Sequence, residues 1–216
     1  MFIFVPSNRD QMAKKTEILQ DPSTEEKIKE AARKVFTKKG FAAARTRDIA
    51  EEAGINLALL NYYFRSKEKL FDLVMRETMQ EFIKGMKGVF NHEESSLLIK
   101  VQKIVDNYID LFKIHPDIPM FVLSEMRTQP DKFIANMGIK SVLLESHFFK
   151  QIMQAGKGKV HPLHFMMNLI GLTVFPFIAS PLLMRVGSLK QKEFDILMEE
   201  RKKMIPLWIE AMMKVK

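Results

Sequence analysis

The sequence predicts an all-α protein of about nine helices, and two observations lead to that prediction. Apolar residues recur with helical spacing along most of the 216 residues, whereas no convincing segment alternates apolar and polar residues as a strand does. The composition, 47% hydrophobic and 28% charged, is typical of a globular protein with a substantial buried core. We therefore expect a three-helix N-terminal domain followed by a larger helical domain.

The composition excludes several classes of protein. The chain contains no cysteine, so disulfides, zinc fingers and a cysteine nucleophile are ruled out. It also lacks a Ser-His-Asp motif, a glycine-rich phosphate loop and a metal-spaced His-Glu pattern. His161 and His164 lie three residues apart, but no third metal ligand is evident nearby. We predict that the chain is not an enzyme and binds no cofactor or metal.

Positive charge is concentrated near the N-terminus. The net charge is +8, and residues 24–70 hold 11 Lys and Arg against 7 Asp and Glu. A basic balance favours nucleic acid or an anionic membrane as a partner. Residues 1–22 are expected to form a flexible arm, because their apolar start is too short for the core of a signal peptide.

The first helix is predicted over residues 24–39. Ser23 and Glu26 have the spacing of an N-terminal capping box. An apolar stripe at helical spacing follows, and Gly40 supplies the C-terminal stop.

Two short helices come next and are joined by a glycine turn. The first begins at Thr46, the expected N-cap, and ends at Gly54, which can adopt the positive φ of a sharp turn. The second covers residues 57–63 and is capped by Asn56. Ser66 is expected to cap the helix after that.

Six longer helices are expected beyond this point, separated by turn-forming residues. They are predicted over residues 67–90, 95–114, 118–128, 131–155, 161–184 and 190–214. Pro176, Pro181 and Pro206 should kink or end the helices that contain them. We place the domain boundary inside the helix that begins at residue 67, which gives domains over residues 23–68 and 69–216.

The short helix over residues 57–63 has one face to anchor it and one face to present. Leu60 and Phe64 lie four residues apart and can hold the helix against the core. The residues left facing outward are Asn56, Leu57, Ala58, Asn61 and Tyr62. This layout is typical of a helix-turn-helix whose second helix enters the major groove, so we predict that the chain binds double-stranded DNA.

The outward residues are our candidates for contacts to base edges. Asn61 can make a bidentate contact to adenine, and Leu57 or Ala58 can touch a thymine methyl group. Contacts to phosphate position a protein on DNA without reading its sequence. We predict them for Arg45, Thr46, Arg47, Tyr63 and Lys67.

Many of these residues occur in an order known from one protein family. The series is Ala31-Ala32, Phe36, Gly40-Phe41, Thr46, Ile49-Ala50, Ala53-Gly54, Tyr63-Phe64, Lys67-Glu68 and Leu70. Through it, residues 23–82 closely resemble the N-terminal domain of TetR-family bacterial repressors. The resemblance implies a cytoplasmic transcriptional regulator that forms a homodimer through its last two helices. It also implies that a small inducer binds the C-terminal domain and releases the operator, which a two-fold dimer makes palindromic.

The chain departs from the family in the second short helix. Many members have Lys-Gly-Thr-Leu-Tyr where this chain has Leu57-Ala-Leu-Leu-Asn61. A common phosphate-binding lysine and a tyrosine are therefore replaced, and their contacts are not carried over.

The C-terminal domain supplies candidates for an effector pocket and a dimer interface. The chain has 16 Met and 17 Phe, most of which ordinary core packing explains, but the resemblance implies a pocket for a small hydrophobic effector. The candidate lining residues are Phe112, Met120, Phe121, Met126, Phe148, Phe149, Met153, Met166 and Met167. The candidate interface residues are Leu169, Leu172, Phe175, Leu197, Met204, Leu207 and Trp208.

One segment also fits a membrane. Residues 163–184 contain no Lys, Arg, Asp or Glu and are long enough to span a bilayer. Polar side chains and two prolines within the segment favour a helix buried in a core or a subunit interface instead. We therefore expect no membrane partner, and a membrane-associated helical protein remains the alternative.

Overall fold

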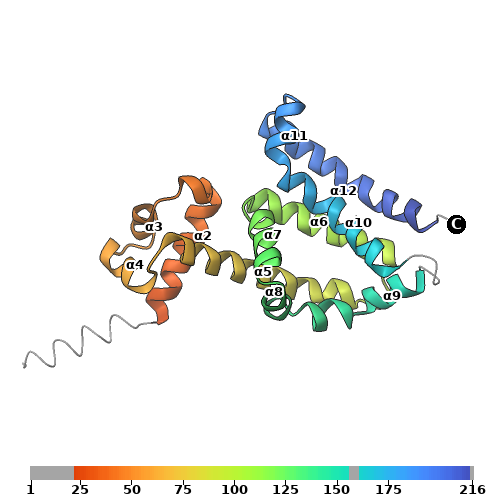
Figure 1. Ribbon diagram of the computed structural model, residues 1–216, viewed down its shortest axis with the longest axis horizontal. Helices are drawn as coiled ribbons and strands as arrows, with labels where there is room; N and C mark the ends of the chain where they lie inside the picture. Colours follow the sequence, from red (N-terminus) through yellow and green to blue (C-terminus); the bar gives the residue numbers. More distant parts are fainter. Residues whose placement is uncertain (1–21, 156–160, 215–216) are drawn as a thin grey trace, which may run out of the picture. The chain divides into compact units, whose positions relative to one another are not determined.

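The computed structural model describes residues 22–155 and 161–214, which form twelve helical elements and no strand (Figure 1). The elements are α2 (Pro22–Ala43), α3 (Thr46–Glu52), α4 (Leu57–Tyr63), α5 (Lys67–Asn91), α6 (Leu97–Ile114), α7 (Ile118–Thr128), α8 (Pro130–Asn136), the π-helical turn η1 (Lys140–Leu144), α9 (His147–Ala155), α10 (Pro162–Ile178), α11 (Ser180–Val186) and α12 (Gln191–Met213). The all-α prediction is confirmed, with more elements than the nine expected. The predicted flexible arm over residues 1–22 lies almost wholly outside the described residues.

The chain divides into two compact units, Met1–Met75 and Arg76–Lys216, with α5 contributing to both. In the N-terminal unit, α2, α3, α4 and the start of α5 bury one apolar face each. The fully or almost fully buried side chains there include Ile28, Ala32, Phe36, Ile49, Leu60, Leu70 and Val74. Phe71 packs against Phe36 and Phe41 with ring centroids 5.1 and 4.6 Å apart, which joins the start of α5 to α2. Burial of these apolar faces is the main stabilising term for the unit.

The second unit is built around α6, which contacts α12, α10 and α9. Its buried residues recur at helical spacing and are Val101, Ile104, Val105, Ile109 and Phe112. Lys113 and Lys202 form ion pairs of 2.6 and 3.0 Å with Glu199, and Lys202 also pairs with Asp110. The α6–α12 pair is therefore held by an apolar seam with ion pairs at its edge.

Two helices of this unit contain a proline. At each proline, a side chain from another helix donates a hydrogen bond to the backbone carbonyl that the proline leaves without its helical donor. Pro176 in α10 has no N–H, so the carbonyl of Leu172, four residues earlier, loses its helical donor. Arg201 of α12 donates to that carbonyl at 2.6 Å. Pro206 in α12 frees the carbonyl of Lys202 in the same way, and Gln102 of α6 donates to it at 3.0 Å. Both helices continue beyond their prolines: α12 runs on to Met213, and α10 ends two residues after Pro176, at Ile178.

The helix predicted over residues 131–155 is not continuous. Gly138 takes a φ of 59° after α8, a conformation that ends a helix readily when the residue is glycine. Ser146 starts α9, because its hydroxyl oxygen accepts a hydrogen bond from the Phe149 N–H at 3.2 Å. The prediction of one continuous helix is wrong because the helical spacing of apolar residues continues across Gly138 and Ser146, which hides the end of one helix and the start of the next.

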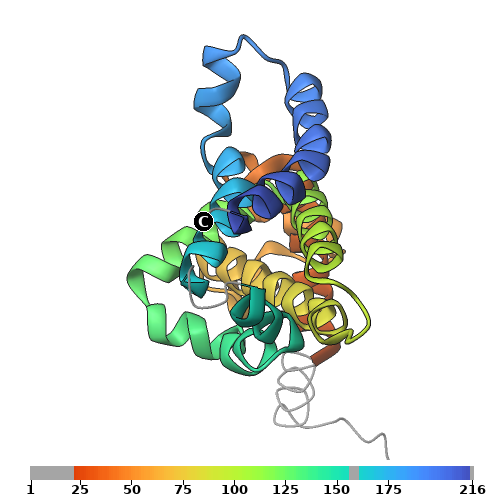
Figure 2. The same cartoon turned by 90° about the vertical axis from the view of Figure 1, so that its right-hand side faces the viewer.

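The predicted helix over residues 161–184 is also divided. It ends as α10 at Ile178, and Ala179 separates it from α11, whose first turn contains Pro181 (Figure 2). Among the residues described, no single helix has the length and apolar character needed to cross a membrane. Only α10 and α11 taken together have that length and apolar character, and these two helices meet at a bend of 69°.

One lysine is fully buried in the second unit. The ammonium of Lys100 in α6 donates to Gln151 Oε1 at 2.9 Å and faces His147 Nδ1 at 2.8 Å, both on α9. A lysine ammonium has only donors, so the His147 Nδ1 must accept. Burial lowers the pKa of Lys100 below its usual value. The contact fixes α9 against α6 through polar atoms rather than through apolar packing.

Candidate DNA interface

The turn between α3 and α4 sets the direction of α4. Gly54 has a φ of 67°, and the Ile55 N–H donates back to the Ala50 carbonyl at 3.0 Å, which closes a tight corner. Leu60 is fully buried and Phe64 is buried beyond the end of α4. The predicted anchoring of α4 through these two residues is confirmed, and the helix packs against α3 (Figure 1).

The first turn of α3 starts one residue earlier than the sequence suggested. Arg45, not Thr46, is the N-cap, and the Asp48 carboxylate accepts from the Arg45 N–H at 3.0 Å. Asp48 also pairs with Lys39 of α2 at 2.9 Å. The hydrogen bond from Lys39, together with that from Arg45, lowers the pKa of Asp48. The start of α3 is thus fixed to α2, and the side chains of Arg45 and Arg47 are left exposed.

The outward face of α4 is smaller than predicted. Asn56 caps the helix, and its Oδ1 accepts from the Leu59 N–H at 2.8 Å. Leu57 is half-buried. Ala58, Asn61 and Tyr62 are exposed, Tyr62 by 53%, and their spacing of three and four residues puts them on one face. Of the five candidate base readers, these three have free side chains on the open surface.

The candidate phosphate-binding residues divide in the same way. Arg45 and Arg47 are exposed, while Thr46 and Tyr63 are half-buried. The Tyr63 ring packs edge-on against that of Tyr62, with centroids 5.7 Å apart. This contact positions the exposed Tyr62 ring at the end of α4.

Lys67 has a contact set that the sequence did not reveal. Its ammonium donates to the carbonyls of Phe41 and Ala44 at 2.9 and 3.1 Å and lies 4.2 Å from the centre of the Phe41 ring. These carbonyls belong to the end of α2 and the link to α3, where helical donors run out. The geometry gives Lys67 a role in closing that corner, and the phosphate contact of Lys67 stays a prediction.

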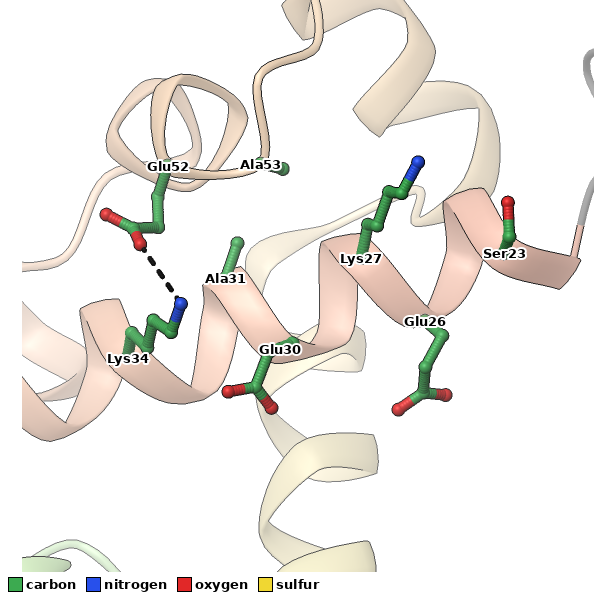
Figure 3. A pocket seen from close by; sticks show the side chains of 8 residues that line it. All are labelled: Ser23, Glu26, Lys27, Glu30, Ala31, Lys34, Glu52 and Ala53. Atoms are coloured by element: carbon green, nitrogen blue, oxygen red, sulfur yellow. Dashed lines mark ion pairs between the residues drawn. The ribbon is translucent and has the colours of Figure 1, made fainter.

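A shallow groove of about 480 Å³ runs between α2 and the end of α3 (Figure 3). It is lined by Ser23, Glu26, Lys27, Glu30, Ala31, Lys34, Glu52 and Ala53. Lys34 and Glu52 form an ion pair of 3.5 Å between the two helices. The groove is charged and lies in the N-terminal unit, so it differs from the predicted effector pocket in both chemistry and place.

The residues predicted to line that pocket are not brought together. Phe112, Phe121 and Phe148 are buried in the core of the second unit. Phe149 and Met166 are half-buried, and the remaining candidates are on the surface: Met120, Met126, Met153 and Met167. Phe112 and Phe148 instead join ladders of rings. One of them runs through Phe82, Tyr108, Phe112, Phe177 and Phe194, with centroids 4.7 to 5.9 Å apart.

The predicted interface residues are divided between the core and the surface. Leu169 is only 3% exposed and Leu172 is half-buried, so neither lies on an open face of α10. Phe175 is 60% exposed, and Leu197, Met204, Leu207 and Trp208 of α12 are exposed as well. Three other exposed apolar residues of α10 share one helical face: Leu163, Met167 and Ile170. These three residues were not proposed from the sequence, although their spacing of four and three positions puts them on one face of a helix.

The two histidines considered as metal ligands have a structural role. The His161 Nδ1 accepts from the Leu163 N–H at 3.2 Å and so caps α10. The ring centres of His161 and His164 are 6.5 Å apart. Within the described ranges, no group of three His, Asp or Glu side chains has the arrangement of a metal site.

Comparison with known proteins agrees with this geometry. Residues 28–74 match the family described as bacterial regulatory proteins, tetR family. The HTH-type transcriptional regulator YttP of Bacillus subtilis is 24% identical over 201 residues, which are 89% of this chain and 95% of that protein. The HTH-type transcriptional repressor NicS of Pseudomonas putida is 27% identical over 148 residues, 65% of this chain and 66% of that protein.

A solved structure shares the fold as well. The transcriptional regulator FadR from Bacillus subtilis, solved in complex with stearoyl-CoA, superposes with a TM-score of 0.55 at 16% identity, covering 83% of this chain and 96% of that one. The short α3–glycine turn–α4 unit lies within the residues that match the family. Residues 28–74 are therefore a helix-turn-helix domain of the tetR family of bacterial regulatory proteins, and the chain as a whole is similar to HTH-type transcriptional regulators.

Proposed function

We propose that the protein is a homodimeric repressor that binds a palindromic operator and leaves it when a small apolar effector binds its second unit. The observation that carries the proposal is the face of α4. Ala58, Asn61 and Tyr62 are exposed on a helix whose opposite side is anchored by the buried Leu60 and Phe64. A short helix held in this way can enter a major groove without losing its own packing.

The charge around α4 supports a DNA partner. Arg45 and Arg47 are exposed at the start of α3, and Arg65 is exposed just beyond α4. Cations at both ends of a groove-reading unit match the phosphates that flank a major groove. The base-reading surface between them carries no charge, so attraction and sequence reading are assigned to different residues.

The exposed apolar residues of α10 and α12 support the homodimer. Leu163, Met167 and Ile170 form one stripe on α10, and Leu197, Met204 and Leu207 form another on α12, which packs beside it. Exposed apolar surface on two adjacent helices is typical of a protein–protein interface. A second copy offers the same surface, and a two-fold pairing buries both. Such a dimer presents two copies of α4 to inverted half-sites.

The aromatic interior of the second unit supports an apolar effector. The ladder from Phe82 to Phe194 provides rings at several depths, and Tyr108 places a hydroxyl among them. Burial raises the pKa of Tyr108 to about 12, so this hydroxyl stays protonated at neutral pH. An apolar effector that carries one polar group matches the chemistry of these side chains. Because FadR shares the fold and was solved with stearoyl-CoA, acyl-CoA thioesters form a rational first panel.

The DNA-binding part is tested with the purified full-length chain and the duplex that precedes its own coding region. We expect nanomolar binding, tight relative to a shuffled duplex of the same composition, with an affinity that falls steeply as salt rises. Equal affinity for the two duplexes at physiological salt would contradict the proposal.

The effector part is tested by adding stearoyl-CoA or free coenzyme A to the preformed DNA complex. We expect stearoyl-CoA to raise the melting temperature of the protein and to lower its affinity for DNA, because a ligand stabilises the state that it binds. Free coenzyme A is the matched control and should do neither. An equal response to both compounds would show that the apolar chain is not what the protein recognises.

A further inference from the structure

None of the side chains at α4 that can reach a base edge is charged. Asn56 and Asn61 are both amides, but the Oδ1 of Asn56 accepts the Leu59 N–H at 2.8 Å and holds the end of the helix. Asn61 is exposed at the middle of the helix, and Ala58 and Tyr62 are exposed beside it. A bidentate contact needs both the oxygen and the nitrogen of an amide. Asn61 is therefore the one amide of α4 with both atoms available.

Cations are absent from this surface. Residues 57–63 contain neither Lys nor Arg, and the exposed Arg45, Arg47 and Arg65 all lie outside α4. Guanine is read most often by Arg or Lys, through O6 and N7. Adenine is read by the amide of Asn or Gln through N6 and N7, and the methyl of thymine by small apolar side chains. Asn61 fits the second description, and the methyl group of Ala58 fits the third.

We propose that α4 selects A·T pairs, with Asn61 bound to an adenine and Ala58 against a neighbouring thymine methyl. This inference rests on the proposed DNA-binding function and specifies which base pairs that function reads. Asn61 and Ala58 lie three residues apart on one face, so their targets are neighbouring steps of the same half-site. The arginines outside α4 then contact the phosphates on either side of these base pairs.

The test is selection of bound duplexes from a randomised pool by the full-length protein, followed by sequencing. Asn61→Ala identifies the pair under Asn61 as the position that loses its preference. We expect the wild type to prefer A·T at that position by about tenfold to a hundredfold, and the variant to accept all four pairs there. Asn61→Arg should move the preference at the same position to G·C.

Asn56→Ser is the matched control, because serine keeps the cap and removes the other amide. Its selected sequences should equal those of the wild type, and a change confined to one base pair would assign the reading to Asn56 and overturn the inference. A strong G·C preference of the wild type at the position defined by Asn61→Ala would also overturn it, while leaving the proposed repressor intact. Enrichment of no sequence at all would contradict the proposed function itself, and the inference with it.

Discussion

A single ammonium group closes the corner of the DNA-binding unit. Lys67 comes from the start of α5 and donates to two carbonyls, those of Phe41 and Ala44, while it lies over the Phe41 ring. Hydrogen bonds from a charged donor are among the stronger ones in proteins. The position of α3, and through it that of α4, therefore depends on a residue outside both helices.

Replacing Lys67 by Met should loosen this corner. The two carbonyls lose their donor while the aliphatic packing on Phe41 is largely kept, so we expect a loss of about 1–3 kcal/mol in the stability of the N-terminal unit. Hydrogen exchange of the amides in residues 28–75 measures it. Lys69→Met, which removes an exposed lysine two residues further along α5, is the control and should leave exchange unchanged. Equal exchange in both variants would show that the corner does not need the ammonium.

His115 at the end of α6 makes stability depend on pH. Burial lowers its pKa below the ordinary 6.5, so the folded state resists a proton that the unfolded chain accepts. As the pH falls below about 6.5, the unfolded state binds more protons and the free energy of unfolding decreases, by at most about 1.4 kcal/mol per pH unit, until the folded pKa is reached. His115→Gln should remove that part of the slope.

The measurement is urea unfolding between pH 7.5 and 5, followed by the fluorescence of Trp208 at one fixed protein concentration. If His115→Gln keeps the wild-type slope, the acid sensitivity has another source.

At the scale of the elements, the proline-containing helices couple α6, α10 and α12. Arg201 replaces the donor that Pro176 lacks. Arg201→Met should therefore destabilise the second unit by about 1–3 kcal/mol, because it leaves the Leu172 carbonyl without a donor. In a Pro176→Ala background, the helical N–H is restored and the same substitution should cost less.

A double-mutant cycle on these two positions, measured by urea unfolding at fixed protein concentration, gives the coupling directly. We expect about 1 kcal/mol or more of coupling, since the arginine matters only when the proline is present. Additive effects of the two substitutions would mean that Arg201 acts through its packing on Trp208, 5.1 Å from the ring centre, rather than through the carbonyl.

The helices of the DNA-binding unit were predictable because each has its own start and stop residues. Asn56, Gly54 and Ser66 act locally, and the structure puts a cap or a turn at all three. The second unit was less predictable, because apolar periodicity continues through Gly138 and Ala179, where the chain breaks. The spacing of apolar residues indicates which residues are buried, but it does not indicate whether the helix is continuous.

The candidate site was predictable in part for a related reason. Exposure on α4 follows from helical spacing, so Ala58, Asn61 and Tyr62 could be found from the sequence. Asn56 can either cap α4 or contact a base through the same side chain. The folded structure shows that it caps the helix, which the sequence alone does not decide. The contacts of Lys67 span more than twenty residues and leave no local pattern.

At the scale of the whole molecule, the proposed repressor requires two copies to meet through α10 and α12. Met167→Asp places a charge in the middle of the exposed stripe of α10, and burying that charge in a dimer would be costly. We expect sedimentation equilibrium to give twice 25.1 kDa for the wild type and 25.1 kDa for the variant.

Met126→Asp is the matched control, because it makes the same change at an exposed methionine of α7. It should remain dimeric. If both variants keep the wild-type mass, the stripes on α10 and α12 are not the interface.

The central claim is that the exposed face of α4 lies against DNA, and one measurement addresses it most directly. Ala58→Glu places a carboxylate on that face, and Ala135→Glu makes the same change of charge at an exposed position of α8. Fluorescence anisotropy with the selected duplex should show that Ala58→Glu loses at least about a hundredfold in affinity, because the new carboxylate faces the electronegative groove, while Ala135→Glu binds like the wild type. Wild-type affinity in Ala58→Glu, with its fold intact by circular dichroism, would contradict the account.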